Sequence, residues 1–147
     1  MTTLTIFTTP KPFTDPHINI IQRNAIRSWI ELGSEVQVIL VGQEEGMPDF
    51  AAEYNLLQLP DVARNEQGTP LISSIFDLAR QHSSSPLLAY INADVLVLPD
   101  FLEMAKIVSG QMEKFLLIGR RWDLDLTELL EFSHGWQVRL QERTTSQ

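Results

Sequence analysis

The chain has 147 residues, enough for one domain that buries roughly two-thirds of its unfolded surface. Its formal net charge of −8 argues against nucleic-acid binding, and the absence of cysteine excludes disulfides and thiolate metal sites. No apolar run is long enough for a transmembrane helix, and the N-terminus lacks the regions of a signal peptide, so we expect a cytoplasmic protein without a membrane span.

The N-terminal part of the chain predicts a strand, a loop and a helix. Residues 4–7 are apolar and β-branched, which is typical of a strand. The loop that follows, residues 8–13, contains two prolines, which fit neither a helix nor the centre of a sheet. Asp15 offers an N-cap and Pro16 fits the first helical position. Apolar residues then recur at helical spacing until Gly33 ends the helix.

The next part of the chain predicts two more strands and two more helices. Residues 36–41 and 56–59 predict strands, with a short helix over 48–54 between them. After a polar loop over 61–68, a helix is expected to begin at residues 69–70. The apolar residues expected on its buried face are Leu71, Ile72, Ile75, Phe76 and Ala79. Strands that alternate with helices indicate an α/β protein with a mostly parallel sheet and helices on both faces.

Residues 87–98 predict the fourth strand and carry the clearest functional signal. Two apolar runs flank Asn92, Ala93 and Asp94, and their length indicates a strand buried on both faces. Because an unpaired carboxylate is costly to bury, Asp94 is expected at the exit of this strand. A carboxylate beside a carboxamide could hold a hard divalent cation there. Asn and Asp are also ordinary turn residues, so a plain strand-to-turn junction is the alternative.

The C-terminal part predicts a helix from residue 99 to Gly110 and a further strand over 115–119. Residues 127–132 and 136–143 predict short amphipathic helices. The common nucleotide and hydrolase motifs are missing: the sequence contains no phosphate-binding glycine motif, no H-E-x-x-H and no G-x-S-x-G.

Right-handed crossovers predict the order 3-2-1-4 for the first four strands. The gap between strands 1 and 4 is then the topological switch point, where open α/β sheets bind ligands. The loop 8–10 and the triplet 92–94 would face one another across this gap, with Arg64 and Asn65 within reach.

On these residues the chain resembles the nucleotide-binding half of a GT-A glycosyltransferase, of the nucleotide-diphospho-sugar transferase type, with Asn92-Ala93-Asp94 in place of the usual Asp-x-Asp motif. The segments that are similar to a group of bacterial and plant GT-A-like proteins are residues 5–13, 61–79, 90–99 and 118–125. The resemblance implies a Rossmann-like GT-A fold. Residues 1–147 would form a single nucleotide-sugar-binding domain without the C-terminal acceptor half.

The resemblance also implies roles for individual residues. The residues expected to bind the nucleotide sugar are Thr8, Thr9, Pro10, Arg64, Asn65, Asn92 and Asp94. Residues 8–10 would line the nucleobase pocket, and Asp94 would hold Mn²⁺ or Mg²⁺ against the diphosphate. Such ions often use only one or two carboxylates and complete their shell with water and phosphate oxygens. Asn92 could bond a ribose hydroxyl but brings no charge, and the alternative for Arg64 is a surface ion pair with Glu66.

The catalytic base is unassigned. Asp123 and Asp125 are the late carboxylates that could serve, and a solvated acidic loop is the alternative for both. Arg120 and Arg121 could bind phosphate or pair with these aspartates. Trp122 and Trp136 could stack on a sugar, although buried packing is the usual role of tryptophan.

Three functions stay open. The first is a GT-A glycosyltransferase that uses a nucleotide-sugar donor and an unknown acceptor. The second is a catalytically silent nucleotide-sugar-binding or protein-interaction module. The third, a flavodoxin-like or receiver-like protein, is disfavoured because no late-strand lysine is present to pair with a phosphoacceptor aspartate. Because the sheet should leave an apolar edge uncovered, we also expect a homo-oligomer that associates through residues 115–136.

Overall fold

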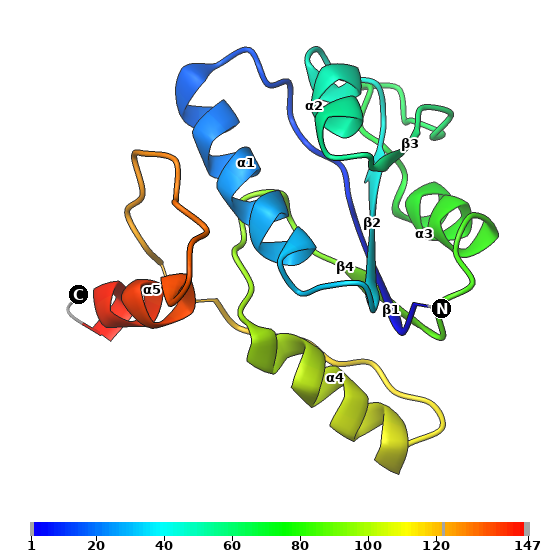
Figure 1. Ribbon diagram of the computed structural model, residues 1–147. Helices are drawn as coiled ribbons and strands as arrows, with labels where there is room; N and C mark the ends of the chain where they lie inside the picture. The colour runs from blue at the N-terminus through cyan, green and yellow to red at the C-terminus, as the bar shows by residue number, and fades with distance from the viewer. Residues whose placement is uncertain (1, 122, 146–147) are drawn as a thin grey trace.

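The computed structural model describes residues 2–121 and 123–145, and its centre is a four-stranded, all-parallel sheet (Figure 1). The strands are β1 (Leu4–Thr8), β2 (Val36–Val41), β3 (Leu57–Leu59) and β4 (Leu87–Tyr90). They lie in the order β3-β2-β1-β4, which confirms the predicted α/β class and the predicted order of the first four strands.

Five helices connect and flank the strands within the described ranges. They are α1 (Pro16–Ile30), α2 (Met47–Glu53), α3 (Ile72–Gln81), α4 (Pro99–Gln111) and α5 (Trp136–Thr145). In this part of the chain, no helix has both the length and the apolar character needed to cross a membrane.

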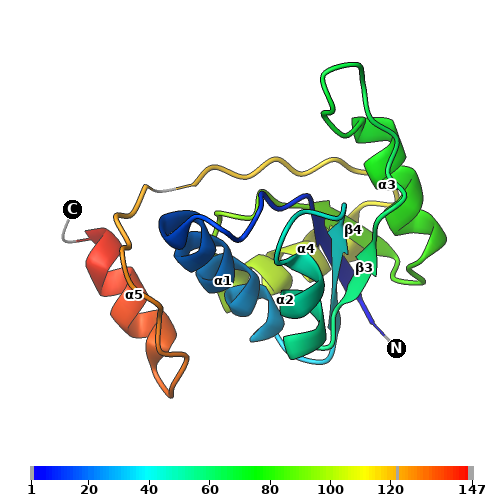
Figure 2. The same ribbon diagram turned by 90° about the horizontal axis from the view of Figure 1, so that it is seen from above.

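The alternation of side chains along β1 divides the core into two layers. Leu4 and Ile6 pack in one cluster with Trp29 of α1 and with residues of α2 and α4. Phe7 packs in the other cluster with Ile75 of α3. Helices therefore cover both faces of the sheet, as expected, with α1 and α2 on one side and α3 on the other (Figure 2).

The first helix begins as the sequence predicts. The Asp15 carboxylate accepts hydrogen bonds from the backbone N–H groups of His17 and Ile18, at 2.9 and 3.0 Å, and Pro16 is the first helical residue. Gly33, with φ of +103°, lies in the turn that follows the helix.

The predicted strand over 87–98 is correct only for its first part. β4 ends at Tyr90 and lies at an edge of the sheet, half-buried, so the expectation of burial on both faces is wrong. The second apolar run is a loop because α1 binds its backbone. The indole N–H of Trp29 donates to the carbonyl of Val95 at 2.8 Å, and the Ser28 hydroxyl accepts the Val97 N–H at 3.0 Å.

The further strand predicted over 115–119 is absent from the sheet, so this prediction is wrong. Residues 113–121 make no backbone hydrogen bond to another described part of the backbone. Leu116 and Ile118 are 86% and 82% exposed. An apolar segment becomes a strand only by pairing, and this one remains unpaired.

The helix predicted over 127–132 is also absent. The side chain of Asn24, on α1, hydrogen-bonds the backbone of this segment. Its amide donates to the carbonyl of Glu128 at 2.9 Å, and its carbonyl accepts the Leu130 N–H at 2.8 Å. These bonds hold the segment as a loop against α1. The helix predicted over 136–143 is confirmed as α5.

The third helix begins two residues later than predicted. Residues Arg64 and Pro70 form an isolated antiparallel bridge, and the Leu71 N–H donates to the carbonyl of Ala63 at 2.8 Å. These contacts keep the chain extended up to Leu71. The expected buried face is correct for Ile75 and Ala79. It is wrong for three residues that are exposed, Leu71, Ile72 and Phe76.

An ion pair ties α4 to the turn before β2. The Lys106 ammonium donates to the Glu35 carboxylate at 2.5 Å, and this hydrogen bond lowers the pKa of Glu35 and raises the pKa of Lys106. Because the pKa of Glu35 is lowered in the folded state, the contribution of the pair is lost as the pH falls through that pKa. Both side chains are exposed, so the contribution is small.

Candidate functional site

The carboxyl ends of β1 and β4 meet where the strand order reverses. β2 and β3 lie on one side of β1, and β4 lies on the other. Phe7 pairs with Tyr90 in the parallel register, so residues 8–10 and 91–94 leave the sheet at the same edge. Open α/β sheets bind ligands at such a switch point. The structure therefore brings the two predicted segments together.

Thr8, the last residue of β1, is fully buried. Its side-chain hydroxyl has no hydrogen-bond partner among the described residues. An unpaired buried hydroxyl costs about 1–3 kcal/mol, so such a group needs an explanation, for example a bound water, ion or ligand. Thr5, on the same strand, is equally buried but satisfied, because its hydroxyl donates to the Ser85 hydroxyl at 2.8 Å.

Side chains from β1 and β4 also meet on the α3 face of this edge. The hydroxyls of Thr9 and Tyr90 are 2.9 Å apart. The ring of Phe7 lies edge-on to the rings of Phe76 and Tyr90, with centroids 4.9 and 5.7 Å apart. Phe76 and Tyr90 are 41% and 38% exposed, so this cluster presents aromatic surface to solvent.

Sequence reasoning overlooks this aromatic cluster. Phe76 is expected in the core of its helix, and Tyr90 inside a fully buried strand. The signal that could have found them is position: Tyr90 stands two residues before Asn92, and the helix that carries Phe76 leads directly into that strand.

Hydrogen bonds anchor the loop between β1 and α1. Gln22 of α1 binds both backbone groups of Lys11: its carbonyl accepts the N–H at 2.6 Å and its amide donates to the carbonyl at 3.0 Å. Pro10 is buried. The Phe13 N–H donates to the carbonyl of Glu45 at 2.8 Å, which joins this loop to the one after β2. Residues 8–13, at the carboxyl end of β1, are therefore already held in place before a ligand binds.

Arg64 lies beside the exit of β2. Its guanidinium donates to the carbonyl of Gly68 at 2.8 Å and lies 3.4 Å from the Glu44 carboxylate. It also lies 3.5 Å from the position that a Cβ on Gly42 would occupy. This places Arg64 at the exit of β2, and its predicted contact with the nucleotide stays a prediction. The alternative ion pair with Glu66 is wrong, because the partner is Glu44.

Asn65 is engaged in its own loop. Its side-chain carbonyl accepts the backbone N–H groups of Gln67 and Thr69, at 3.0 and 2.9 Å. Such an Asx turn is a structural role. It leaves only the amide of Asn65 available to a ligand.

Asn92 and Asp94 lie on the turn that follows β4, and both are exposed. The Val95 N–H donates to the carbonyl of Asn92 at 3.1 Å, which closes the turn. The Asp94 carboxylate has no hydrogen bond or ion pair to another described residue. Across residues 2–121 and 123–145, no group of three His, Asp or Glu side chains could surround a metal ion. A cation at Asp94 would therefore depend on phosphate oxygens and water for most of its ligands.

The late carboxylates make no hydrogen bond or ion pair with the exits of β1 and β4. Asp123 is exposed and lies 3.5 Å from the Arg121 guanidinium. The backbone carbonyl of Asp125 accepts from Arg143 at 3.4 Å. Trp122 lies outside the described residues. Trp136 is buried and packs edge-on against Phe132, with centroids 4.9 Å apart, so for this residue the packing role is correct.

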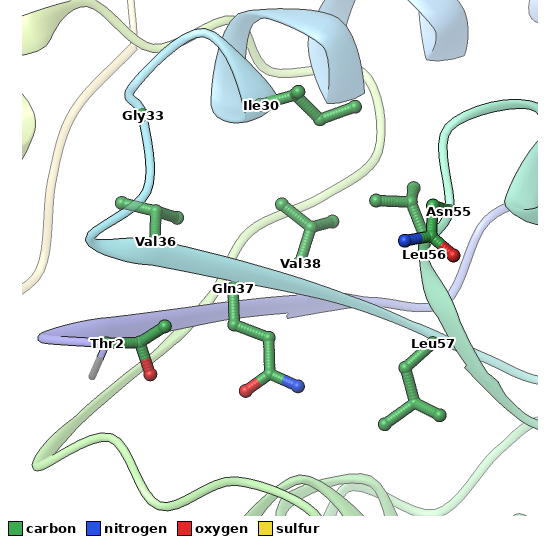
Figure 3. A pocket seen from close by; sticks show the side chains of 9 residues that line it. All are labelled: Thr2, Ile30, Gly33, Val36, Gln37, Val38, Asn55, Leu56 and Leu57. Carbon is green, nitrogen blue, oxygen red and sulfur yellow. The ribbon is translucent and has the colours of Figure 1, made fainter.

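A surface hollow of about 360 Å³ lies at the opposite, amino end of the strands (Figure 3). Val36 and Val38 line it together with Leu57 of β3. β3 is short and begins opposite Ile39, so the first residues of β2 have no neighbouring strand on that side. The hollow therefore results from the length of β3 and is separate from the carboxyl edge.

A comparison with protein-family models found no match, and a comparison with curated proteins found none either. The geometry of the carboxyl edge is therefore the basis for assigning a function.

The contact between the two loops at this edge predicts a difference between two glycines. Gly46 and Gly68 both have positive φ, +84° and +83°, so alanine at either position should cost about 1 kcal/mol of unfolding free energy. At Gly46 the added Cβ would lie only 2.8 Å from the Cβ of Phe13, whereas at Gly68 nothing lies within 4 Å. Overpacking should add about 1–3 kcal/mol to Gly46→Ala. Equal losses in urea unfolding of the two variants would contradict the tight contact.

Proposed function

We propose that the chain binds a nucleotide-diphospho-sugar at the carboxyl edge between β1 and β4, as a GT-A glycosyltransferase-type domain. The observation that carries the proposal is the buried, unpartnered hydroxyl of Thr8 at the topological switch point. Asp94, whose carboxylate is free, and Asn92 lie on the turn that follows the neighbouring strand, β4. Polar groups without partners at such a point are what a polar ligand would satisfy.

The aromatic cluster extends the proposal to the nucleobase. The exposed parts of Tyr90 and Phe76 offer ring surface for a planar base, and the hydroxyls of Thr9 and Tyr90 lie beside it. The neighbouring wall, residues 8–13, is fixed by Gln22, so little ordering would be needed on binding.

A divalent cation fits this edge in part. Asp94 would supply one carboxylate to Mn²⁺ or Mg²⁺, and Asn92 a neutral oxygen. When bound, such an ion neutralises the charge of a diphosphate leaving group. Arg64, at the exit of β2, would bring the positive charge that an otherwise acidic chain needs to bind phosphate.

A catalytically silent nucleotide-sugar-binding module is the second candidate. The observation that favours it concerns the late carboxylates: Asp123 is exposed, pairs with Arg121 and makes no hydrogen bond or ion pair with the exits of β1 and β4. Transfer needs an acceptor held in line and a base within hydrogen-bond reach. Slow hydrolysis of a donor sugar by the chain, or its absence, would distinguish the two candidates.

Replacing Asp94 tests the cation site. Asp94→Asn should leave the fold intact, because the side chain has no partner among the described residues, and should abolish metal-dependent binding. A ligand present at ~100 times its dissociation constant adds ~2.7 kcal/mol of stability, which is a midpoint shift of about 5–10 °C at this chain length. The measurement is thermal unfolding with UDP-, GDP- and ADP-sugars, with and without Mn²⁺. Asp77→Asn, an exposed aspartate on α3, is the matched control. Failure of the natural chain to show any Mn²⁺-dependent shift would refute the cation site.

Replacing Arg64 tests the phosphate contact. Arg64→Ala should weaken nucleotide-sugar binding by about tenfold or more, because charge-assisted bonds contribute about 1.5–3 kcal/mol. Glu44→Gln removes the same ion pair but keeps the guanidinium, so its affinity should be unchanged or higher. Calorimetric titration of both variants separates a binding role from a structural one. If both variants bind like the natural chain, Arg64 serves only its own loop.

A further inference from the structure

The outer edge of β4 is open. Among the described residues, β4 pairs only with β1. The backbone N–H groups of Leu87 and Ile91 donate toward β1, to Thr3 and Phe7. Because these directions alternate along a strand, the backbone groups of Leu88 and Tyr90 point to the open edge. An unpaired edge of this kind is a template for another strand.

The same chain carries an unpaired, extended apolar segment. Residues 115–119 make no backbone hydrogen bond within the described chain, and they run outside the sheet, past α4 (Figures 1 and 2). Phe115, Leu116, Leu117 and Ile118 place apolar side chains on both faces of an extended strand. A strand that is apolar on both faces is typical of a parallel sheet that helices cover on both sides.

The surroundings of the open edge match this segment. Phe76 and Tyr90 leave apolar surface exposed in the α3 layer, and Met104 and Ile107 are exposed apolar side chains of α4. The charges also match. In parallel pairing, Arg120 and Arg121 would follow the added strand to the carboxyl end of β4, where Asp94 is exposed.

We propose that a second copy of this chain occupies the edge: residues 115–119 of each copy add to β4 of the other as a fifth parallel strand. A single chain leaves the outer edge of β4 and residues 115–119 unpaired. Because each copy carries both, a reciprocal exchange between two copies pairs both edges and both segments in a closed dimer. This inference does not depend on the proposed function, because it concerns the outer edge of β4 and needs no ligand.

Cross-linking tests the exchange directly, since the chain has no cysteine of its own. Ala89→Cys and Leu117→Cys place one thiol on β4 and one on the segment. In a mixture of the two single variants, a short bis-maleimide reagent can join the two positions only between copies. We expect a covalent heterodimer from the mixture, and much less dimer from either variant alone. If the mixture gives no heterodimer, or if a double variant is joined only within one chain, the exchange is wrong.

Sedimentation provides the second test. The natural chain should sediment as a dimer at micromolar concentration. Leu116→Arg should raise the dissociation constant by at least about tenfold, because it introduces a charge where an apolar side chain is buried on pairing. Leu129→Arg, at another exposed leucine, is the matched control and should leave the dimer unchanged. A natural chain that remains monomeric, or equal effects of the two substitutions, would overturn the proposal.

Discussion

The pairing of β1 on both of its edges is the constraint on which the rest of the structure depends. All five residues of β1 are buried, and the strand is hydrogen-bonded to β2 on one side and β4 on the other. Its side chains alternate between the two core layers, so that Ile6 packs in one layer and Phe7 in the other. β2 and β3 follow on one side of β1, and α3 then leads to β4 on the other side. The strand order of the described sheet therefore reverses only between β1 and β4. The candidate site is a consequence of this topology.

Much of this framework could be predicted from local rules. The handedness of crossovers gives the strand order, and Asp15 and Pro16 mark the start of α1. The wrong predictions concern segments whose secondary structure depends on residues distant in the sequence. The apolar run 95–98 resembles a strand, but Trp29 and Ser28 bind its backbone and hold it as a loop. Residues 115–119 resemble a strand too, yet they make no backbone hydrogen bond within the described chain. Apolar periodicity identifies residues that need burial and does not identify their partners.

The candidate site could be predicted in outline only. The sequence places Thr8, Thr9, Asn92 and Asp94 after two strands, and the topology brings those strands together. Whether each polar group already has a hydrogen-bond partner depends on tertiary contacts, which the spacing of residues along the sequence does not reveal. Asn65 looks available in the sequence, yet its carbonyl closes a turn. Thr8 lies in a strand, and its buried hydroxyl has no partner among the described residues. The contribution of Phe76 depends on its contact with Phe7, which no local pattern predicts.

The most direct measurement compares valine at the two buried threonines of β1. If the Thr8 hydroxyl is kept for a ligand, Thr8→Val should raise the free energy of unfolding by about 1–3 kcal/mol, because it removes an unsatisfied buried hydroxyl, and should weaken nucleotide-sugar binding. Thr5→Val should instead lower the free energy of unfolding, since its hydroxyl is bonded to Ser85, and leave binding unchanged. Urea unfolding and calorimetric titration of both variants supply the four values. A Thr8→Val variant that is less stable than the natural chain and binds equally well would contradict a ligand site at the exit of β1.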